Sequence, residues 1–174
     1  MALIKSLRGY TPYWGDNCFF AENATVIGDV QMGNHCTVWF NAVIRGDVNS
    51  IRFGDYCNVQ DGAVIHCTYQ KTKTIVGNRV SIAHNAIVHG CTIEDDVLIG
   101  MGAIVMDGAH IKSGAIIAAG AIVLANSVVD ENTIWGGNPA KFIKYTGEKV
   151  SEIQRIANNY PKYAAWFQEE SSEK

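Results

Sequence analysis

Aliphatic residues recur at every sixth position through the C-terminal half of the chain, and a small or β-branched residue stands four positions after each. The aliphatic series is Ile93, Ile99, Val105, Ile111, Ile117, Val123 and Val129, and the second series is Val97, Ala103, Ala109, Ala115, Ala121, Ser127 and Thr133. A period of six fits neither an α-helix nor a plain strand. It fits a short strand followed by a tight turn, in which one aliphatic side chain per unit points inward.

The same phase runs through the preceding part of the chain. Its aliphatic and aromatic positions there are Met32, Val38, Ile44, Phe53, Val59, Ile65, Val76, Ile82 and Val88. Three units close a triangular coil of about 18 residues, and such coils stack about 4.8 Å apart as parallel strands. We therefore predict an all-β fold, a parallel β-helix of hexapeptide repeats, for residues 1–145.

Two interruptions of the phase predict loops. Nine residues separate Ile44 from Phe53, so three are inserted near residues 48–50. Eleven separate Ile65 from Val76, so five are inserted within residues 67–74.

The pattern changes to helical steps of three and four residues between Glu148 and Gln168. The apolar positions are Val150, Ile153, Ala157, Tyr160, Ala164 and Phe167, which predicts an α-helical segment within residues 146–174. Pro161 is expected to break it into two pieces, because proline cannot continue a helix unkinked. The apolar face is expected to pack on the β-helix, and the mixed charges of the other face disfavour a membrane-surface role.

Composition narrows the function further. The chain has 174 residues and a formal net charge of −3, with no basic stripe, so nucleic acid and anionic membranes are not expected partners. Lys5 and Arg8 interrupt the first apolar run, and the most apolar segment, 115–125, is too short to span a bilayer. Five cysteines without a CxxC pair predict reduced thiols. We therefore expect a soluble, cytoplasmic protein.

Three histidines stand at positions where the repeat makes their placement predictable. His66 and His89 directly follow the equivalent residues Ile65 and Val88, so they are expected to stack in one column, one coil apart, pointing away from the core. His84 lies on a different edge, and one chain cannot easily bring it to the same point. Three-fold packing of such prisms would place His84 of one chain against the His66/His89 column of the next.

Three converging imidazoles form a zinc-type ligand set that leaves a fourth position for water. The alternative is that these histidines only bond to backbone or bridge subunits. His35 and His110 fall at corner positions of their hexads and are interpreted as ordinary surface residues.

Polar residues near the predicted histidine column extend the candidate site. Arg45 occupies the column of His66 one coil earlier, with Asp47 two residues on, and an ion pair at a subunit interface is as good an explanation as a chemical role. Asn58, Gln60 and Asp61 lie on the edge before His66. The uncharged amide of Gln60 could orient a metal-bound hydroxide without competing for the cation.

With these residues in place, the chain resembles the γ-class carbonic anhydrase family of left-handed β-helix proteins. The stretches that carry the resemblance are NAVIRGDVNSI, NVQDGAVIH, SIAHNAIVHGC and VLIGMGAIVMDGA, and it extends from about Tyr10 through Phe142.

The resemblance implies a homotrimer with a metal at each subunit interface, Zn²⁺ or alternatively Fe²⁺, bound by His66 and His89 of one subunit and His84 of another. It implies reversible hydration of CO2 to bicarbonate by a metal-bound hydroxide. It also implies that Arg45 and Asp47 form an intersubunit ion pair and that Gln60 contacts the metal-bound solvent. Asn58 and Asp61 match family positions near the site.

The chain departs from the family's active prototype in its proton-transfer residues. The prototype has an acidic residue directly after the RGD motif, where this chain has Val48, and an acidic loop shortly after the first histidine ligand. The corresponding loop here is CTYQKTKT, which contains no carboxylate. Fast proton export is therefore not expected, and turnover is expected to be slow or to depend on buffer.

Three other functions are compatible with the pattern. Hexapeptide β-helices also form acyltransferases that bind coenzyme A, although three converging histidines have no place in that chemistry. The same metal site could hydrolyse a thioester or another ester, and a trimeric metal-binding protein without catalysis is the third alternative.

Overall fold

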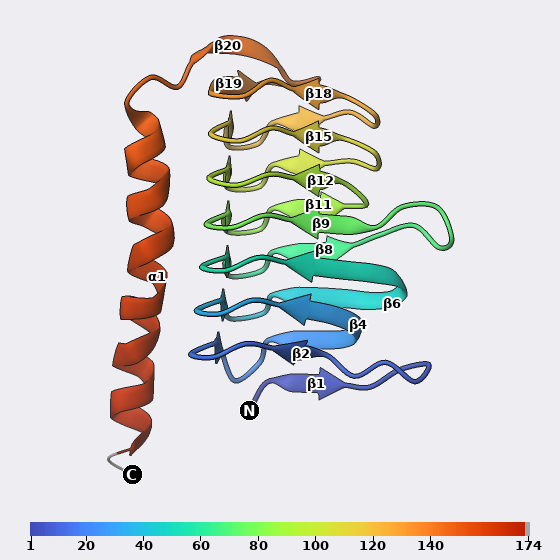
Figure 1. Cartoon of the computed structure of the whole chain (residues 1–174), viewed down its shortest axis with the longest axis vertical. Coiled ribbons are helices and arrows are strands. Elements are labelled where there is room, and N and C mark those ends of the chain that lie inside the picture. Colours follow the sequence, from blue (N-terminus) through green and yellow to red (C-terminus); the bar gives the residue numbers. More distant parts are fainter. Residues whose placement is uncertain (173–174) are drawn as a thin grey trace.

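The computed structural model describes residues 1–172 as a stack of short parallel strands with one long helix beside it (Figure 1). The stack is a solenoid of about seven turns, as a hexapeptide left-handed β-helix requires. Glu173 and Lys174, which end the segment expected to be helical, lie outside the described residues.

The solenoid has three faces, and each coil contributes a short strand to each face. The first consists of β3 (Phe19–Phe20), β5 (Thr37–Val38), β7 (Asn58–Val59), β10 (Ser81–Ile82), β13 (Leu98–Ile99), β16 (Ile116–Ile117), β19 (Thr133–Gly136) and the antiparallel β20 (Lys141–Tyr145). The second includes β1 (Leu3–Lys5), β8 (Val64–His66), β11 (Ile87–His89), β14 (Ile104–Val105) and β17 (Ile122–Val123). The third includes β2 (Tyr13–Trp14), β9 (Thr74–Val76), β12 (Thr92–Ile93), β15 (His110–Ile111) and β18 (Val128–Val129).

Two long strands, β4 (Thr25–Met32) and β6 (Val43–Phe53), pass round the corner between the second and third faces. The insertion expected as a loop near residues 48–50 therefore lies inside β6, and the ladder to β4 absorbs it through a register shift between Gly28 and Val30. The insertion after β8 does form a loop, which projects from the solenoid between β8 and β9 (Figure 1).

The core is the column of aliphatic side chains that the six-residue period predicts. Ile65, Ile82, Val88 and Ile111 are completely buried, and Ile65 pairs with Val88 across neighbouring coils. Each coil thus removes one aliphatic side chain per face from water, which is the main stabilising contribution in a fold that repeats the same contact.

Helix α1 (Lys149–Ser172) packs along the first face, against β5 and β10, and is one continuous helix (Figure 1). The expectation that Pro161 divides it was wrong. Proline removes one backbone hydrogen bond, but apolar contacts continue on both sides of it. Tyr160 and Phe167 both pack against Trp39, with ring centroids 5.5 and 5.6 Å apart, and this packing keeps the two halves on one face.

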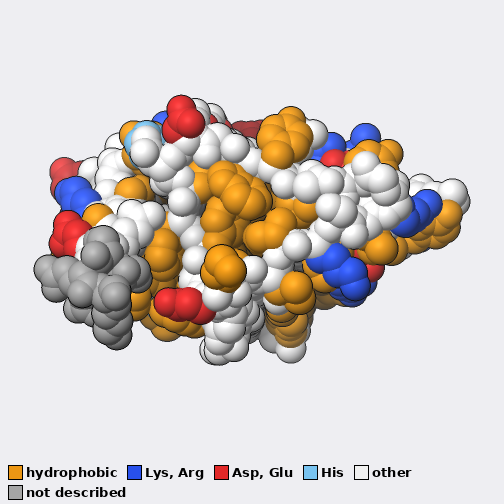
Figure 2. Space-filling model, turned by 90° about the horizontal axis from the view of Figure 1, so that it is seen from below, with side chains coloured by type: hydrophobic (Ala, Val, Ile, Leu, Met, Phe, Trp, Pro, Cys, Tyr) orange, Lys and Arg blue, Asp and Glu red, His pale blue; other side chains and the backbone are white. Residues whose placement is uncertain are grey.

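The N-terminal end of the solenoid exposes hydrophobic side chains across the middle of its end face (Figure 2). A hollow of about 510 Å³ lies there, lined by Ile4, Trp14 and Phe19 among others. Within residues 1–172, no helix is both long and apolar enough to cross a membrane.

Candidate metal centre

His66 and His89 stand side by side on the second face, as the repeat predicted. They are register partners in β8 and β11, and Nδ1 of His66 lies 3.1 Å from Nε2 of His89. Both side chains point away from the core and are partly exposed, because they follow the inward-pointing Ile65 and Val88. The facing nitrogens are close to the separation of about 3.3 Å that two imidazoles have on one tetrahedral Zn²⁺.

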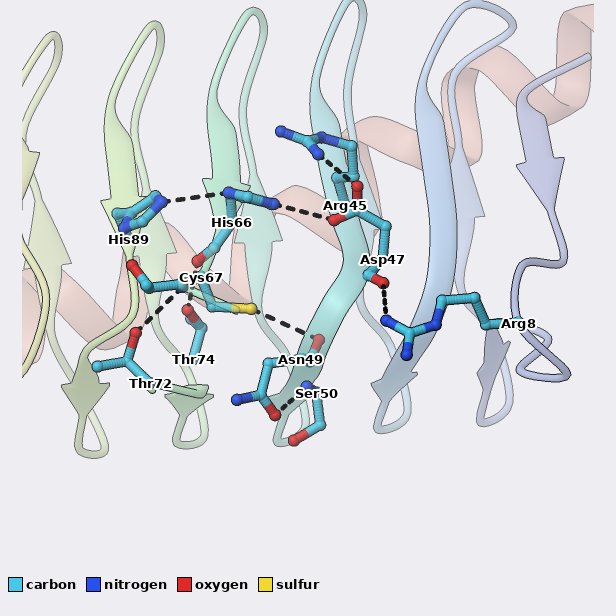
Figure 3. A network of polar contacts seen from close by, with 11 residues as sticks. Arg8, Arg45, Asp47, Asn49, Ser50, His66, Cys67, Thr72, Thr74 and His89 are labelled. Atoms are coloured by element: carbon cyan, nitrogen blue, oxygen red, sulfur yellow. Dashed lines mark hydrogen bonds and ion pairs between the residues drawn. The ribbon is translucent and has the colours of Figure 1, made fainter. Parts of the chain in front are cut away.

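The outer nitrogen of each of these rings is held by a carboxylate. Nε2 of His66 lies 2.9 Å from Oδ1 of Asp47, and Nδ1 of His89 lies 2.9 Å from Oδ2 of Asp107. Figure 3 shows His89, His66 and Asp47 in a row across neighbouring strands. Metal-binding histidines characteristically donate their second N–H to such a group, which fixes the tautomer.

The surroundings of Asp47 and Asp107 lower the pKa of each carboxyl group and so favour its ionised form. Burial raises the pKa of Asp47, but hydrogen bonds from His66 and Arg45 outweigh it and hold that pKa below its usual value. Burial likewise raises the pKa of Asp107, and Thr72, Thr68 and His89 together outweigh it.

When each neutral imidazole donates its outer N–H to a carboxylate, the two inner nitrogens face each other with lone pairs. A cation between them removes this repulsion. These two nitrogens therefore fit two ligand positions of a metal ion, and any third ligand must come from elsewhere.

The third predicted ligand, His84, lies apart from this pair. It follows β10 on the first face, its Nδ1 is 2.9 Å from Oδ2 of Asp61, and its side chain is 40% exposed. Among residues 1–172, no group of three His, Cys, Asp or Glu side chains of one chain could hold a metal. The structure thus brings His66 and His89 together and leaves His84 outward-facing, with a carboxylate on its Nδ1 as on the outer nitrogens of the other two.

The two predicted amides are buried in the coil before His84. Gln60 donates through Nε2 to Oδ1 of Asn58 at 2.9 Å, and Asn58 donates to Oγ of Ser81 at 2.8 Å. Gln60 and His84 line a groove of about 380 Å³ between α1 and the first face. Tyr160 of α1 lines the same groove, and burial raises its pKa to about 12, so its hydroxyl stays protonated.

The groove exists because the residue after each inward aliphatic side chain changes along the first face. Trp39 fills this position in an early coil and contacts α1 directly. Ala83, Gly100 and Ala118 occupy it in later coils, and all three line the groove. Small side chains there leave room between the solenoid and the helix.

Arg45 and Asp47 form an ion pair within the chain, next to His66. Arg8 also donates to the backbone oxygen of Asp47, at 3.5 Å (Figure 3). Asp47 therefore connects the RGD segment to the histidine pair, a contact that the sequence pattern did not specify.

The sequence pattern did not identify Asp107 or its two threonine partners, Thr68 and Thr72, as part of the site. Thr68 and Thr72 lie in the inserted loop, which the repeat cannot place, but Asp107 stands two residues after Val105, the core residue one coil beyond Val88. That position beside His89 is the signal that could have identified it.

The two remaining histidines, His35 and His110, lie in different kinds of backbone structure. His35 lies in a corner turn, with φ 56°, and stacks on Tyr56 at 4.6 Å. His110 was expected at a corner, but it lies in strand β15, where its Nε2 is 2.6 Å from Oε1 of Glu94. The outward-pointing position before Ile111 accepts a histidine because Glu94, one coil earlier, supplies a partner.

Comparison with known proteins agrees with the repeat. The family model of the bacterial transferase hexapeptide (six repeats) matches residues 15–46 and 90–125. A Methanocaldococcus jannaschii protein named "Probable carbonic anhydrase" is 50% identical over 84% of this chain and 92% of its own length. A Geobacillus kaustophilus protein named "Carbonic anhydrase" is 39% identical over 95% of this chain and 91% of its own length.

Two further proteins show how much of the chain the similarity covers. "Gamma carbonic anhydrase 2, mitochondrial" of Arabidopsis thaliana is 39% identical over 93% of this chain, which spans about 60% of that relative's length. The crystal structure of a hexapeptide transferase family protein from Anaplasma phagocytophilum superposes with a TM-score of 0.90 at 35% identity, covering 95% of this chain and 98% of the other. Taken with the histidine pair, these similarities establish that the chain belongs to the γ-class carbonic anhydrase family.

Proposed function

We propose that this protein hydrates CO2 reversibly at a metal ion held between subunits by His66 and His89 of one chain and His84 of another. The observation that carries the proposal is the pair of imidazole nitrogens 3.1 Å apart, each ring held from behind by a carboxylate. The named activities of the relatives from M. jannaschii and G. kaustophilus support this reaction over others that the fold could perform.

A homotrimer would complete the ligand set. The outward side chains around the histidine pair form an apolar surface, in which Val64, Ile87, Met106 and Leu124 are each more than a third exposed. A second chain would bury this surface. Three-fold packing also supplies the imidazole that one chain lacks, because closed symmetry places the same two patches in contact at every interface.

Three imidazoles suit Zn²⁺, and Fe²⁺ is the alternative for the same donor set. When bound, such a cation supplies Lewis acidity that makes water a nucleophile near neutral pH. We further propose a cytoplasmic location, which the five free thiols support.

The chain's own residues would orient the reactants. Asn58 and Ser81 fix the amide of Gln60, so that it can hydrogen-bond an oxygen of substrate or water without carrying charge. Asp61 holds Nδ1 of His84 and leaves Nε2 as the ligand atom. Arg45 keeps Asp47 ionised and thereby holds His66 in its binding tautomer.

Proton export is the step that this chain serves least. The loop at residues 67–73 has no carboxylate, and the carboxylate nearest to it, Asp107, already accepts three hydrogen bonds. The proton must therefore pass to buffer, and we expect the rate to rise with buffer concentration.

Stopped-flow CO2 hydration tests the proposal. Protein purified without oxygen and loaded with Zn²⁺ or Fe²⁺ should turn over in concentrated buffer, and His84→Ala should lose both bound metal and turnover. His110→Ala is the matched control, because it removes an outward-facing histidine with a carboxylate partner from another face. Metal content that survives His84→Ala would contradict the interfacial site, and a fully loaded trimer without turnover would contradict CO2 hydration.

The groove beside His84 favours one second candidate, hydrolysis of an ester or thioester by the same site. Its volume of about 380 Å³ and its wall of Leu98, Ile116 and Ile156 suit an acyl chain better than CO2. An assay of acyl thioesters of increasing chain length would separate the two reactions. Thiol release that requires His84 would support hydrolysis, whereas transfer of the acyl group to an added amine or alcohol would indicate an acyltransferase.

A further inference from the structure

Asp107 connects a loop to one of the two paired histidines. It follows β14, and its two carboxylate oxygens have different partners. Oδ1 accepts hydrogen bonds from the hydroxyls of Thr68 at 2.8 Å and Thr72 at 2.6 Å, while Oδ2 lies 2.9 Å from Nδ1 of His89. The loop hydroxyls therefore hold one oxygen in place, and this fixes the direction in which the other accepts from the imidazole.

The backbone beside His89 is shaped to admit this arrangement. Gly90 has φ +57°, and a Cβ atom built on it would lie 2.2 Å from Oδ1 of Asp107 and 2.2 Å from Oγ1 of Thr72. Any side chain at residue 90 would push the carboxylate and the threonine apart. A glycine at this position is what lets both groups lie against the chain directly after the histidine.

The loop is closed by an internal hydrogen bond, and Thr74 at its C-terminal end ties it to the backbone beside both histidines. Thr72 Oγ1 accepts a hydrogen bond from the backbone N–H of Thr68, at 3.1 Å. Thr74, at the start of β9, donates to the carbonyl oxygen of His66 at 2.7 Å and accepts from the N–H of Gly90 at 3.0 Å. The inserted segment is thus bonded through Thr74 to the backbone of His66 and of Gly90, as well as to Asp107.

We propose that Asp107 is a positioning residue for His89, and that the loop at residues 67–73 acts through Thr68 and Thr72 to hold Asp107 in place. This inference rests on the proposed metal site. The loop then contributes to metal affinity instead of carrying protons. Its two hydroxyls set the orientation of a carboxylate, and the carboxylate sets the tautomer and the ring plane of the ligand.

The test measures metal binding in the intact chain, with Co²⁺ as the probe. Competition with a chelator gives the affinity, and the visible absorption of bound Co²⁺ reports ligand geometry. Asp107→Asn should weaken binding about 10- to 100-fold and change the absorption bands. Thr72→Val should weaken it less, because Thr68 still bonds Oδ1. The matched control is Glu94→Gln, which alters the carboxylate partner of His110 and should leave both readouts unchanged.

The outcomes separate this inference from the function on which it rests. If the wild-type protein binds no Co²⁺, the proposed metal site is wrong and this role falls with it. If the wild type binds Co²⁺ and Asp107→Asn binds it equally tightly with the same spectrum, only the positioning role is wrong. Should Asp107→Asn fail to fold, as circular dichroism would reveal, Thr72→Val decides alone, and unchanged affinity and spectrum in that variant would overturn the proposal.

Discussion

The coils before Ile93 and the coils from Ile93 to Val129 are built from the same repeat but differ in regularity. The later coils continue for seven hexads without an inserted residue. The earlier coils contain both insertions, the one within β6 and the one between β8 and β9, and they hold His66, His84 and His89. The regular coils provide repeated burial, and the candidate metal-binding histidines lie in the coils where the repeat is interrupted.

One insertion precedes His66 in the chain, and the other follows it directly, before His89. Asp47 stands directly before the residues inserted in β6, and Thr68 and Thr72 lie in the loop after β8. An interruption frees the backbone from the strict stacking of the coils, so side chains can approach the outward histidines from the side. The regular coils have no inserted residues to free their backbone in this way. Asp107 comes from these coils and still contacts the histidine pair, because it lies in the coil next to His89.

The largest expected effect separates the irregular region from the rest. His66→Ala should reduce the affinity for Zn²⁺ by roughly 100-fold or more, because it removes one of the three proposed ligands, with little loss of stability since the side chain points outward. Metal analysis after dialysis measures this. His110→Ala should retain full metal content, and equal loss in both variants would contradict the distinction between the two regions.

The next effect should appear in the regular region and leave the metal site intact. Ile117 is completely buried in the core, so Ile117→Ala should lower the free energy of unfolding by about 2–5 kcal/mol. Denaturant titration measures the change. Metal stoichiometry at low denaturant should equal that of the wild type, and loss of metal before unfolding would mean that the two regions are coupled.

The smallest effect concerns an ion pair that joins the two regions. Arg79 donates two hydrogen bonds to Asp96, at 2.7 and 2.9 Å. These bonds lower the pKa of Asp96 by more than burial raises it, so that pKa stays below its usual value. A carboxyl group with a lowered pKa stabilises the fold above the pKa of the unfolded chain, about 4, and loses that contribution as the pH falls through the folded value.

Asp96→Asn should therefore cost about 1 kcal/mol at pH 7, and the difference from wild type should shrink below about pH 4. Urea unfolding at several pH values measures it. A difference that stayed constant down to pH 2 would show that the contribution is not one of charge.

Much of the candidate site could be predicted because the repeat fixes register. The equivalence of Ile65 and Val88 was enough to place His66 beside His89, and the same count placed His84 on another face. Period alone gives these placements, since one outward position per strand follows directly from one inward position.

The features that could not be predicted from the sequence depend on contacts that lie outside the six-residue repeat. Pro161 stays within one helix because aromatic packing on Trp39 continues past it. The contacts of Thr72 depend on the path of an inserted loop, for which the six-residue count gives no coordinates. His110 was misplaced by one position, and its partner Glu94 lies one coil away.

The stacking of His66 on His89 has a consequence for how such a protein can change over time. Their spacing is set by the distance between neighbouring backbones, and this distance is the same from one coil to the next. Whole coils beyond residue 111 could be added or lost by duplication or deletion without altering that measure. The geometry of the histidine pair is in this sense independent of the length of the protein, and lineages could vary the one while inheriting the other.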